Sequence, residues 1–277
     1  MIPITGKTGL LCILADPIAQ VRTPQLVNRL LQAHGDDAVM VPIHVAPAGL
    51  ADTLHALRSA RNLWGMVVTV PHKMDVVALC DEVEPDAQAI GAVNVVRREN
   101  DGRLVGAMLD GVGFLRGLNG YGRPVRGSAV YMAGAGGAAN AIAFALAQAG
   151  AARLTVHNRS RARIDALASR LRTLYPAIEV SAGNDDPGGH DFVINATSLG
   201  MADGDPLPLN AERLHADQLV ADIIMEPAVT PLLAHARARG CETYGGLGML
   251  EGQVADMVAF FKAGRTVDAR ASDRSTA

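Results

Sequence analysis

Residues 128–150, SAVYMAGAGGAANAIAFALAQAG, decide the fold. An apolar run leads into a glycine turn, and a stretch of small residues follows it to Gly150, so the pattern predicts strand, turn and helix. The turn, GAGGAA at 134–139, fits the dinucleotide-binding sequence G-x-G-x-x-A. Gly134 would allow the tight turn, Gly136 the close approach of a pyrophosphate, and Ala139 the packing of helix on strand. The stretch predicts a dinucleotide-binding domain, and the alternative is a glycine turn that only packs.

The same alternation of short apolar runs with helical periodicity continues along the chain. Strands are expected at 10–15, 39–45, 64–70, 153–158, 191–195, 218–224 and 241–244, and a hairpin over 94–109 turns at Asp101-Gly102. Helices are expected at 23–34, 47–60, 160–174, 229–240 and 248–263 and directly after Lys73, with Thr23 as an N-cap before Pro24. Alternating strands and helices predict an α/β fold with parallel sheets.

Composition and length bound the function. At ~150 residues per domain, 277 residues suggest two domains. Hydrophobic residues make up 49% and charged residues 19%, which argues against disorder, and a net charge of −3 gives no signature of nucleic-acid binding. Cys12, Cys80 and Cys241 lie far apart, so we expect no metal site and a reduced, cytoplasmic protein. No apolar run reaches ~18 residues, so no membrane span is expected, and the polar residues 268–277 predict a frayed tail.

The residues after the second strand of the dinucleotide-binding domain indicate which dinucleotide binds. An NAD site usually has Asp or Glu there, about 20 residues after the glycine turn, to bind the ribose hydroxyls. This chain has HNRS at 157–160, with no acid. Arg159 offers a planar cation to a 2′-phosphate, Asn158 and Ser160 offer hydrogen bonds, and Arg163 lies near the start of the next helix. NADP is therefore expected rather than NAD, unless these arginines are only a solvated helix face.

Two charged residues follow apolar strands in the first part of the chain. VTVPHK, residues 68–73, places Lys73 after a strand, where ligands of open α/β sheets bind. GAMLDGVGF, residues 106–114, places Asp110 after another apolar strand and before a glycine. An amine and a carboxylate that meet in a cleft can take a proton from a hydroxyl while a nicotinamide takes the hydride. From local sequence alone, an exposed lysine and a helix N-cap aspartate remain the alternatives.

The motifs and their order resemble those of shikimate dehydrogenases along nearly the whole chain. ADPIAQVRTPQLVN at 15–28 is similar to the family's first substrate motif, G-x-P-I-x-H-S-x-S-P, and VVTVPHK at 67–73 is similar to N-V-T-V-P-x-K. GAVN at 91–94 matches G-A-V-N, and GAMLDGVGF is similar to G-x-N-T-D-G-x-G-F. The nucleotide-domain motifs are matched by GAGGAA, by NRS and by NATSLGM at 195–201. The end of the family pattern is matched by TPLL at 230–233 and by GLGML with Gln253.

The resemblance implies an NADP-dependent enzyme of two domains with a cleft between them. Residues 1–109 plus 246–277 would form an α/β substrate domain, and residues 110–245 would form a Rossmann domain that binds NADP. Lys73 and Asp110 would be the catalytic pair, acting on a small-molecule substrate. No nucleic-acid or membrane partner is implied, and the assembly would be a monomer or a homodimer.

The resemblance also implies a set of binding residues. The implied substrate contacts are Val21, Thr23, Val67, Thr69, Asn94, Met225 and Gln253. The implied cofactor contacts are Gly134, Ala135, Gly136, Gly137, Ala138, Asn158, Arg159, Ser160, Arg163, Asn195, Ala196, Thr197, Ser198, Gly246 and Met249.

The substrate positions are where this chain departs from the family pattern. Several hydrogen-bonding groups of the family are replaced here, mostly by apolar side chains: Val21 and Thr23 stand for two serines that hold the shikimate carboxylate, Val67 for Asn, Met108 and Leu109 for Asn and Thr, and Met225 for Tyr. Each lost buried hydrogen bond is worth ~1–3 kcal/mol, so shikimate is expected to be a poor substrate. A less polar cyclic alcohol or ketone would fit better.

Other interpretations remain open from the sequence. Gln20, Arg22 or Thr23 could hold the substrate in another pose, which would leave a shikimate or quinate dehydrogenase. A second alternative is an NADP-binding regulatory protein that has lost catalysis, although such a protein would not need both Lys73 and Asp110.

Overall fold

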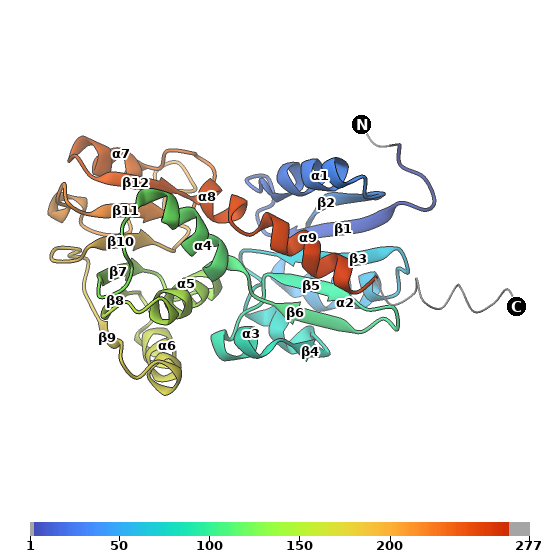
Figure 1. Ribbon diagram of the computed structural model, residues 1–277, viewed down its shortest axis with the longest axis horizontal. Coiled ribbons are helices and arrows are strands. Elements are labelled where there is room, and N and C mark those ends of the chain that lie inside the picture. Colours follow the sequence, from blue (N-terminus) through green and yellow to red (C-terminus); the bar gives the residue numbers. More distant parts are fainter. Residues whose placement is uncertain (1–2, 266–277) are drawn as a thin grey trace, which may run out of the picture. The chain divides into compact units, whose positions relative to one another are not determined.

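The computed structural model describes residues 3–265, which divide into two compact units (Figure 1). Unit 1 comprises the residues up to Leu109 and the segment that begins at Val254, and unit 2 comprises Asp110–Gln253. The second boundary thus follows Gln253, whereas the sequence placed it before residue 246. The tail expected at 268–277 lies outside the described residues. Within residues 3–265, no helix has the length and apolarity needed to cross a membrane.

The sheet of unit 1 has six strands, in the order β2-β1-β3-β5-β6-β4. Their bounds are Gly9–Ala15 (β1), Ala38–His44 (β2), Leu63–Val68 (β3), Glu82–Val83 (β4), Val95–Arg98 (β5) and Leu104–Ala107 (β6). The buried strand β1 pairs in parallel with β2 and β3. β5 runs antiparallel to both β3 and β6. The hairpin expected over 94–109 is confirmed, and it explains the mixed sheet, because a tight turn can join only antiparallel neighbours.

Helices and 3-10 turns connect these strands. The helices are α1 (Thr23–His34), α2 (Leu50–Arg58), α3 (Pro85–Ile90) and α9 (Val254–Ala263), and the 3-10 turns are η1 (Pro47–Gly49) and η2 (Asp75–Leu79). In Figure 1, α9 lies along the strands of this sheet, and it contacts α1, β3 and β5. The expectation of a helix directly after Lys73 is correct only as the 3-10 turn η2, because a short segment there has to lead into β4.

The start of α1 differs from the sequence prediction. Its N-cap is Arg22, which makes no side-chain cap bond, and Thr23 is the first helical residue. The prediction of Thr23 as the N-cap is therefore wrong. The physical reason is the backbone, which already has helical angles at Arg22 (φ −110°, ψ −7°), so Thr23 falls inside the first turn, where it is 3% exposed.

The sheet of unit 2 is parallel throughout, in the order β12-β11-β10-β7-β8-β9 (Figure 1). Its strands are Ala129–Ala133 (β7), Arg153–His157 (β8), Glu179–Ala182 (β9), Phe192–Asn195 (β10), Leu219–Asp222 (β11) and Glu242–Gly245 (β12). The helices of this unit are α4 (Asp110–Leu118), α5 (Gly137–Gln148), α6 (Arg161–Leu174), α7 (Pro231–Ala238) and α8 (Gly246–Glu251). β10 and β11 are buried along their whole length, as expected for central parallel strands covered on both faces.

The last helical stretch is divided in two. The sequence predicted one helix over 248–263, but α8 ends at Glu251 and α9 begins at Val254. The close packing of α8 on α4 explains this division, because glycines bring the two backbones together. A side chain at Gly113 of α4 would collide with Met249 O, and one at Gly252 would collide with Gly113 O. This packing is also why residues 246–253 belong to unit 2 rather than to unit 1.

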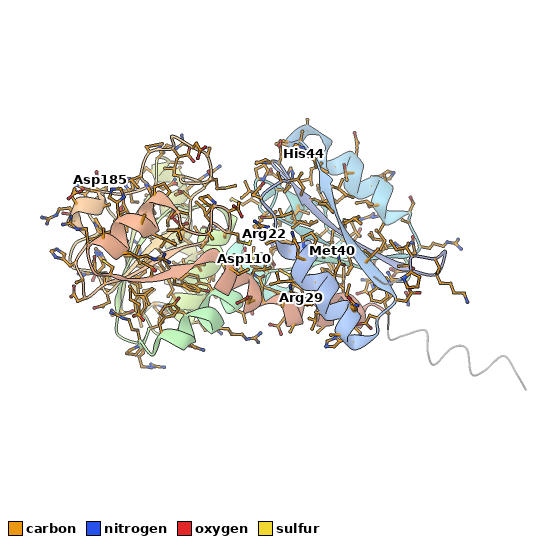
Figure 2. The ribbon with its side chains drawn as sticks, turned by 90° about the horizontal axis from the view of Figure 1, so that it is seen from above. Arg22, Arg29, Met40, His44, Asp110 and Asp185 are labelled. Atoms are coloured by element: carbon orange, nitrogen blue, oxygen red, sulfur yellow. The ribbon has the colours of Figure 1, made fainter. Side chains whose placement is uncertain are left out.

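Asn28 on α1 closes the outer edge of the first sheet. Its side chain accepts from Met40 N at 2.7 Å and donates to Met40 O at 3.0 Å, and Figure 2 labels Met40 on the edge strand beside α1. Neighbouring positions of β2 are protected as well, since Ala38 N donates to Asp36 O at 3.0 Å and Pro42 has no N–H. These bonds fix α1 on β2 and leave little of the edge free for another strand.

Replacing Asn28 with Ala should lower the free energy of unfolding by about 1–3 kcal/mol, because Met40 would lose both of its side-chain partners. Urea unfolding measures this change, and sedimentation velocity would report self-association through the opened edge. Gln25→Ala, at an exposed position of the same helix, is the control and should change stability by less than about 0.5 kcal/mol. Equal stability of the two variants would contradict the role assigned to Asn28.

Candidate functional site

Lys73 follows β3 and is held through its backbone by other segments of unit 1. Val93 N donates to Lys73 O at 2.8 Å, and Thr69 N donates to Leu14 O at 3.0 Å. The segment between β3 and η2 is thereby joined to β1 and to the residues that precede β5. The side chains of Lys73 and Thr69 are both partly buried. A lysine at the carboxyl end of a buried strand can reach a ligand there, as in other open α/β sheets.

His72 anchors the same segment from inside unit 1. Its side chain is 0% exposed, and its Nε2 donates to Val45 O at 2.7 Å. A carbonyl oxygen can only accept, so this bond fixes the ring proton on Nε2. Nδ1 is buried without a hydrogen-bond partner among residues 3–265. The bond to Val45 O thus holds the segment that carries Lys73.

Asn94 lies where the ends of β3 and β6 come together. It is 1% exposed, and its Oδ1 accepts from Leu109 N at 2.8 Å. Its backbone N donates to Ala107 O at 3.0 Å, and its backbone O accepts from Val68 N at 2.8 Å. One side chain therefore sets the path of the backbone that leads into Asp110.

Three positions of unit 1 at which the chain departs from the family's substrate pattern are buried and apolar. Val21 is 8% exposed, Val67 3% and Met108 8%. Val67 lies in register between Ile13 of β1 and Val95 of β5, close to the carboxyl end of β3. These side chains offer no hydrogen bond to a polar ligand group that packs against them. In unit 2, Met225 follows β11 and is partly buried.

Asp110 is the first residue of α4 in unit 2, and Figure 2 labels it. It is 2% exposed, and Gln253 Nε2 donates to its Oδ1 at 3.2 Å. The same Gln253 amide also donates to Met249 O at 3.3 Å. The start of the helix adds a partial positive charge beside this carboxyl group. Unit 2 therefore brings together three residues that the sequence placed in the site, while the pairing of Asp110 with Lys73 of unit 1 stays a prediction.

The glycine turn between β7 and α5 has the conformation that a pyrophosphate requires. Gly134 has a φ of +114°, in the region that favours glycine, and its N donates to His157 O at 2.8 Å. A Cβ at Gly134 would lie only 2.7 Å from Ala196 O, whereas Gly136 has nothing within 4 Å on that side. The turn thus packs on one side and is open on the other, where α5 begins at Gly137. The N–H groups of residues 136–138 at this helix start suit a phosphate.

The end of β8 carries the residues that are expected to select NADP. Ser160 is the N-cap of α6 and accepts from Arg163 N at 3.4 Å. Asn158 Nδ2 donates to Ser160 O at 3.1 Å, which orders the short loop. The side chains of Arg159 and Arg163 are exposed. Neither position is acidic, so nothing in this loop repels a 2′-phosphate.

The loop after β10 is ordered by Asn195, which is fully buried. Its Oδ1 accepts from Thr197 N at 3.0 Å and from Thr197 Oγ1 at 2.7 Å. Its Nδ2 donates to Leu199 O at 3.0 Å. Ala196 N donates to Ala133 O at 2.8 Å, so the loop is joined to the strand that leads into the glycine turn. Ser198 is exposed at the tip of this loop.

Sequence reasoning missed Asp222, the last residue of β11. It is 1% exposed and accepts from Asn195 Nδ2 at 3.1 Å, from Thr230 Oγ1 at 2.8 Å and from Ile224 N at 3.1 Å. Burial raises the pKa of the Asp222 carboxyl to about 6, against the effect of these donors. The sequence does show an acid inside the apolar run QLVADII at 218–224, but this run was interpreted only as a strand. Gly246 belongs to the same edge, since its N donates to Ile224 O at 3.3 Å.

Known proteins are similar to this chain over most of its length. The family model described as shikimate dehydrogenase substrate binding domain matches residues 13–96, and the one described as shikimate / quinate 5-dehydrogenase matches residues 122–201. The shikimate dehydrogenase (NADP(+)) of Rhodospirillum rubrum is 42% identical over 255 residues, which cover 89% of each chain.

Solved structures agree with this assignment. Shikimate 5-dehydrogenase from Thermus thermophilus, in complex with NADP(H) and shikimate, has a TM-score of 0.81 at 32% identity and covers 92% of this chain and 94% of its own. The ligand-free 5-ketofructose reductase of Gluconobacter sp. strain CHM43 has a TM-score of 0.79 at 34% identity, with 94% of each chain covered. The predicted fold class and family are confirmed. The chain belongs to the shikimate dehydrogenase family, a family of NADP-dependent oxidoreductases.

Proposed function

We propose that this chain catalyses reversible hydride transfer between NADP(H) and an uncharged secondary alcohol or ketone. Lys73 and Asp110 would move the hydroxyl proton. One contrast carries the proposal: Lys73 and Asp110 stand at the family's catalytic positions, whereas several polar groups that hold the substrate in the family are replaced here by the apolar side chains of Val21, Val67, Met108, Leu109 and Met225. The oxidoreductase chemistry follows from membership of the family, and the substrate class follows from the altered positions.

The apolar positions argue against a carboxylate substrate. Val21 and Val67 are 8% and 3% exposed and replace groups that would donate or accept hydrogen bonds. A buried carboxylate or hydroxyl that gains no partner costs several kcal/mol, about 1–3 for each lost bond. The similarity to 5-ketofructose reductase supports this substrate class, since 5-ketofructose is an uncharged keto sugar.

A second candidate is shikimate or 3-dehydroshikimate itself. The relative that is 42% identical is named shikimate dehydrogenase, which favours this candidate. In that case the carboxylate would need new partners, and Gln20, Arg22 and Thr23 are the polar residues of the first substrate motif. Gln20 Nε2 already donates to Pro17 O at 2.7 Å, and Thr23 is 3% exposed. Arg22, which is exposed at the start of α1, would have to supply the charge (Figure 2).

The proposed mechanism assigns proton transfer to the chain. NADP, when bound, would accept or supply the hydride at its nicotinamide. Asp110, held by Gln253 at the start of α4, would polarise the reacting hydroxyl or the Lys73 amine. Lys73 would take the hydroxyl proton during oxidation and return it during reduction. The bond from His72 to Val45 would hold the backbone that carries Lys73.

The proposed cofactor site uses four strand ends of unit 2, those of β7, β8, β10 and β12. Gly134–Ala138 would bind the pyrophosphate through backbone N–H groups at the start of α5. Asn158–Ser160 and Arg163 would bind the 2′-phosphate at the end of β8. The loop of residues 195–198, together with Gly246 and Met249, would line the nicotinamide.

Turnover of a panel of alcohols and ketones with NADP(H) tests the catalytic assignment. Lys73→Ala and Asp110→Asn should each lower kcat about 100-fold to 10,000-fold, because general acid–base catalysis contributes that much. Both variants should still bind NADP in a fluorescence titration. Lys7→Ala and Asp165→Asn, at exposed positions, are the matched controls. Full activity of both catalytic variants would refute the assignment, and no turnover of any compound would favour a regulatory protein.

Removal of the Arg159 cation tests the choice of cofactor. Arg159→Ala should weaken NADP binding about tenfold or more, since a charge-assisted bond contributes ~1.5–3 kcal/mol, while NAD binding changes little. Dissociation constants of both dinucleotides measure the difference. Arg170→Ala, further along α6, is the control. Equal losses for NADP and NAD would exclude a contact to the 2′-phosphate.

Restoring the family's polar groups tests the substrate class. The double variant Val21→Ser, Val67→Asn should raise kcat/KM for shikimate about tenfold or more, if each regained bond contributes ~1–3 kcal/mol. It should also lower kcat/KM for the best uncharged substrate of the panel. Val112→Ser, 42% exposed on α4, is the control for a Val→Ser change. Efficient use of shikimate by the wild-type enzyme would instead support the second candidate.

A further inference from the structure

We infer that Asp222 is a positioning residue for the nicotinamide half of the cofactor site. Its ionised carboxylate holds in place the loop of residues 195–199 and the segment that precedes Gly246. The inference rests on the proposed binding of NADP to unit 2. Asp222 itself is buried and touches no ligand in this scheme, so it acts through Asn195 and Ile224.

The amide of Asn195 is saturated with hydrogen bonds, and Asp222 decides its orientation. Two protons on Nδ2 go to Leu199 O at 3.0 Å and Asp222 Oδ2 at 3.1 Å. The Oδ1 atom accepts twice from Thr197. If the amide turned over, its NH₂ group would face the two Thr197 donors and its oxygen would face Asp222. The carboxylate therefore fixes which side of Asn195 binds the loop.

The same carboxylate reaches two further segments of the carboxyl edge. Its Oδ1 accepts from Ile224 N at 3.1 Å, and Ile224 O in turn accepts from Gly246 N at 3.3 Å, where α8 begins. Its Oδ2 accepts from Thr230 Oγ1 at 2.8 Å, and Thr230 is the N-cap of α7. Gly134 packs directly against the loop that Asn195 orders, because a Cβ at Gly134 would lie 2.7 Å from Ala196 O. One buried group thus controls the loops that surround the proposed nicotinamide position.

The geometry favours the ionised form of Asp222. Its partners on Asn195, Thr230 and Ile224 each point a proton at the carboxylate. A proton on Oδ2 would face the Asn195 and Thr230 donors, and a proton on either oxygen would remove the negative charge that strengthens all three bonds. Because burial raises the pKa of Asp222 to about 6, this loss falls in a mildly acidic range.

The groups that donate hydrogen bonds to Asp222 are all uncharged. The charged side chains of the surrounding elements are either bonded to other groups or exposed. β7, β10 and the rest of β11 carry none. On β12, Glu242 pairs with Arg123, and on α7, Arg237 is bonded to Thr243 and His235 to Pro231 O. Arg239 at the end of α7 pairs with Glu212, and Asp205 is bonded to Gly200 N. Asp203, Glu226 and Glu251 of α8 are exposed.

Protonation of Asp222 should affect folding and cofactor binding in opposite directions. The pKa is higher in the folded protein, about 6, than the ordinary value of 3.8, so the folded state binds the proton more tightly. The contribution of this group to stability is therefore full at low pH and is lost as the pH rises through about 6. The positioning of the loop is instead lost as the pH falls. A residue that served stability alone would give only the first effect.

The test compares two ligands over the range from about pH 7.5 to 5, which brackets a group that titrates near 6. One ligand is NADP, and the other is 2′-phospho-ADP-ribose, which is NADP without its nicotinamide. Both carry the same 2′-phosphate, so its titration cancels in the ratio of their dissociation constants. We call the dissociation constant of 2′-phospho-ADP-ribose divided by that of NADP the NADP advantage. This ratio should fall about tenfold below the transition, because a buried charge-assisted bond is lost. Thermal unfolding of the wild type and of Asp222→Asn gives the stability profile.

Variants separate positioning from folding. Asp222→Asn should lose the NADP advantage at every pH, because its NH₂ group must face a donor. Thr230→Ser should keep it and Thr230→Val should lose part of it, since only serine retains the hydroxyl. Asp191→Asn, at the opposite end of β10, is the matched control, where Asp191 Oδ2 accepts from Ala129 N at 2.7 Å. The wild-type profile needs no variant and tests the inference even if Asp222→Asn fails to fold.

The outcomes are distinct. An NADP advantage that falls through pH 6 in the wild type and is small and constant in Asp222→Asn would support the inference. A ratio that is independent of pH in the wild type, or unchanged in a folded Asp222→Asn, would overturn it. Failure of both ligands to bind would refute the proposed NADP site itself and, with it, the inference.

Discussion

The hydrogen bond from Asn195 Nδ2 to Asp222 Oδ2 joins the ends of two central strands, and the carboxyl edge of unit 2 depends on it. Both side chains are almost completely buried, so each polar atom has to find a partner within the protein. Those partners are the backbone of the following loops and the hydroxyls of Thr197 and Thr230. Unit 1 meets the same constraint with Asn94, which binds Leu109 N and so directs the chain toward Asp110. In both units, buried side chains at strand ends determine the loop geometry.

This arrangement separates the chemistry of the site from the recognition of its substrate. The backbone that presents Lys73 is held by Val93 and His72, and the Asp110 carboxylate is held by Gln253 at a helix start. None of these groups needs the side chains at 21 or 67. Those positions can therefore become apolar without disturbing the proposed catalytic residues, and the cost falls on any ligand that brings a carboxylate to them. Family membership and an altered substrate are compatible for this physical reason.

Much of the fold could be predicted because the local sequence patterns favour the same strands, turns and helices that the sheets contain. Glycine marks three turns that were predicted correctly: the turn at 134–139, the hairpin at Asp101-Gly102 and the end of α5 before Gly150. In each, a glycine has a positive φ, a conformation that the residue type itself favours. The errors occur where tertiary packing decides. The helical backbone at Arg22 moved the N-cap of α1 by one residue, and the close approach of Gly252 to α4 divided the last helix. The roles of Asp222 and Thr230 could not be predicted, because an acid and a hydroxyl eight positions apart meet only after β11 and α7 are in place.

The central claim is that this family member keeps the proton-transfer residues and has lost the shikimate carboxylate site. Calorimetric titration of shikimate into the NADP-saturated protein tests it most directly, because it needs neither turnover nor a known substrate. We predict no saturable binding with a dissociation constant below about 1 mM. Saturable binding in the micromolar range, abolished by Arg22→Ala, would contradict the claim.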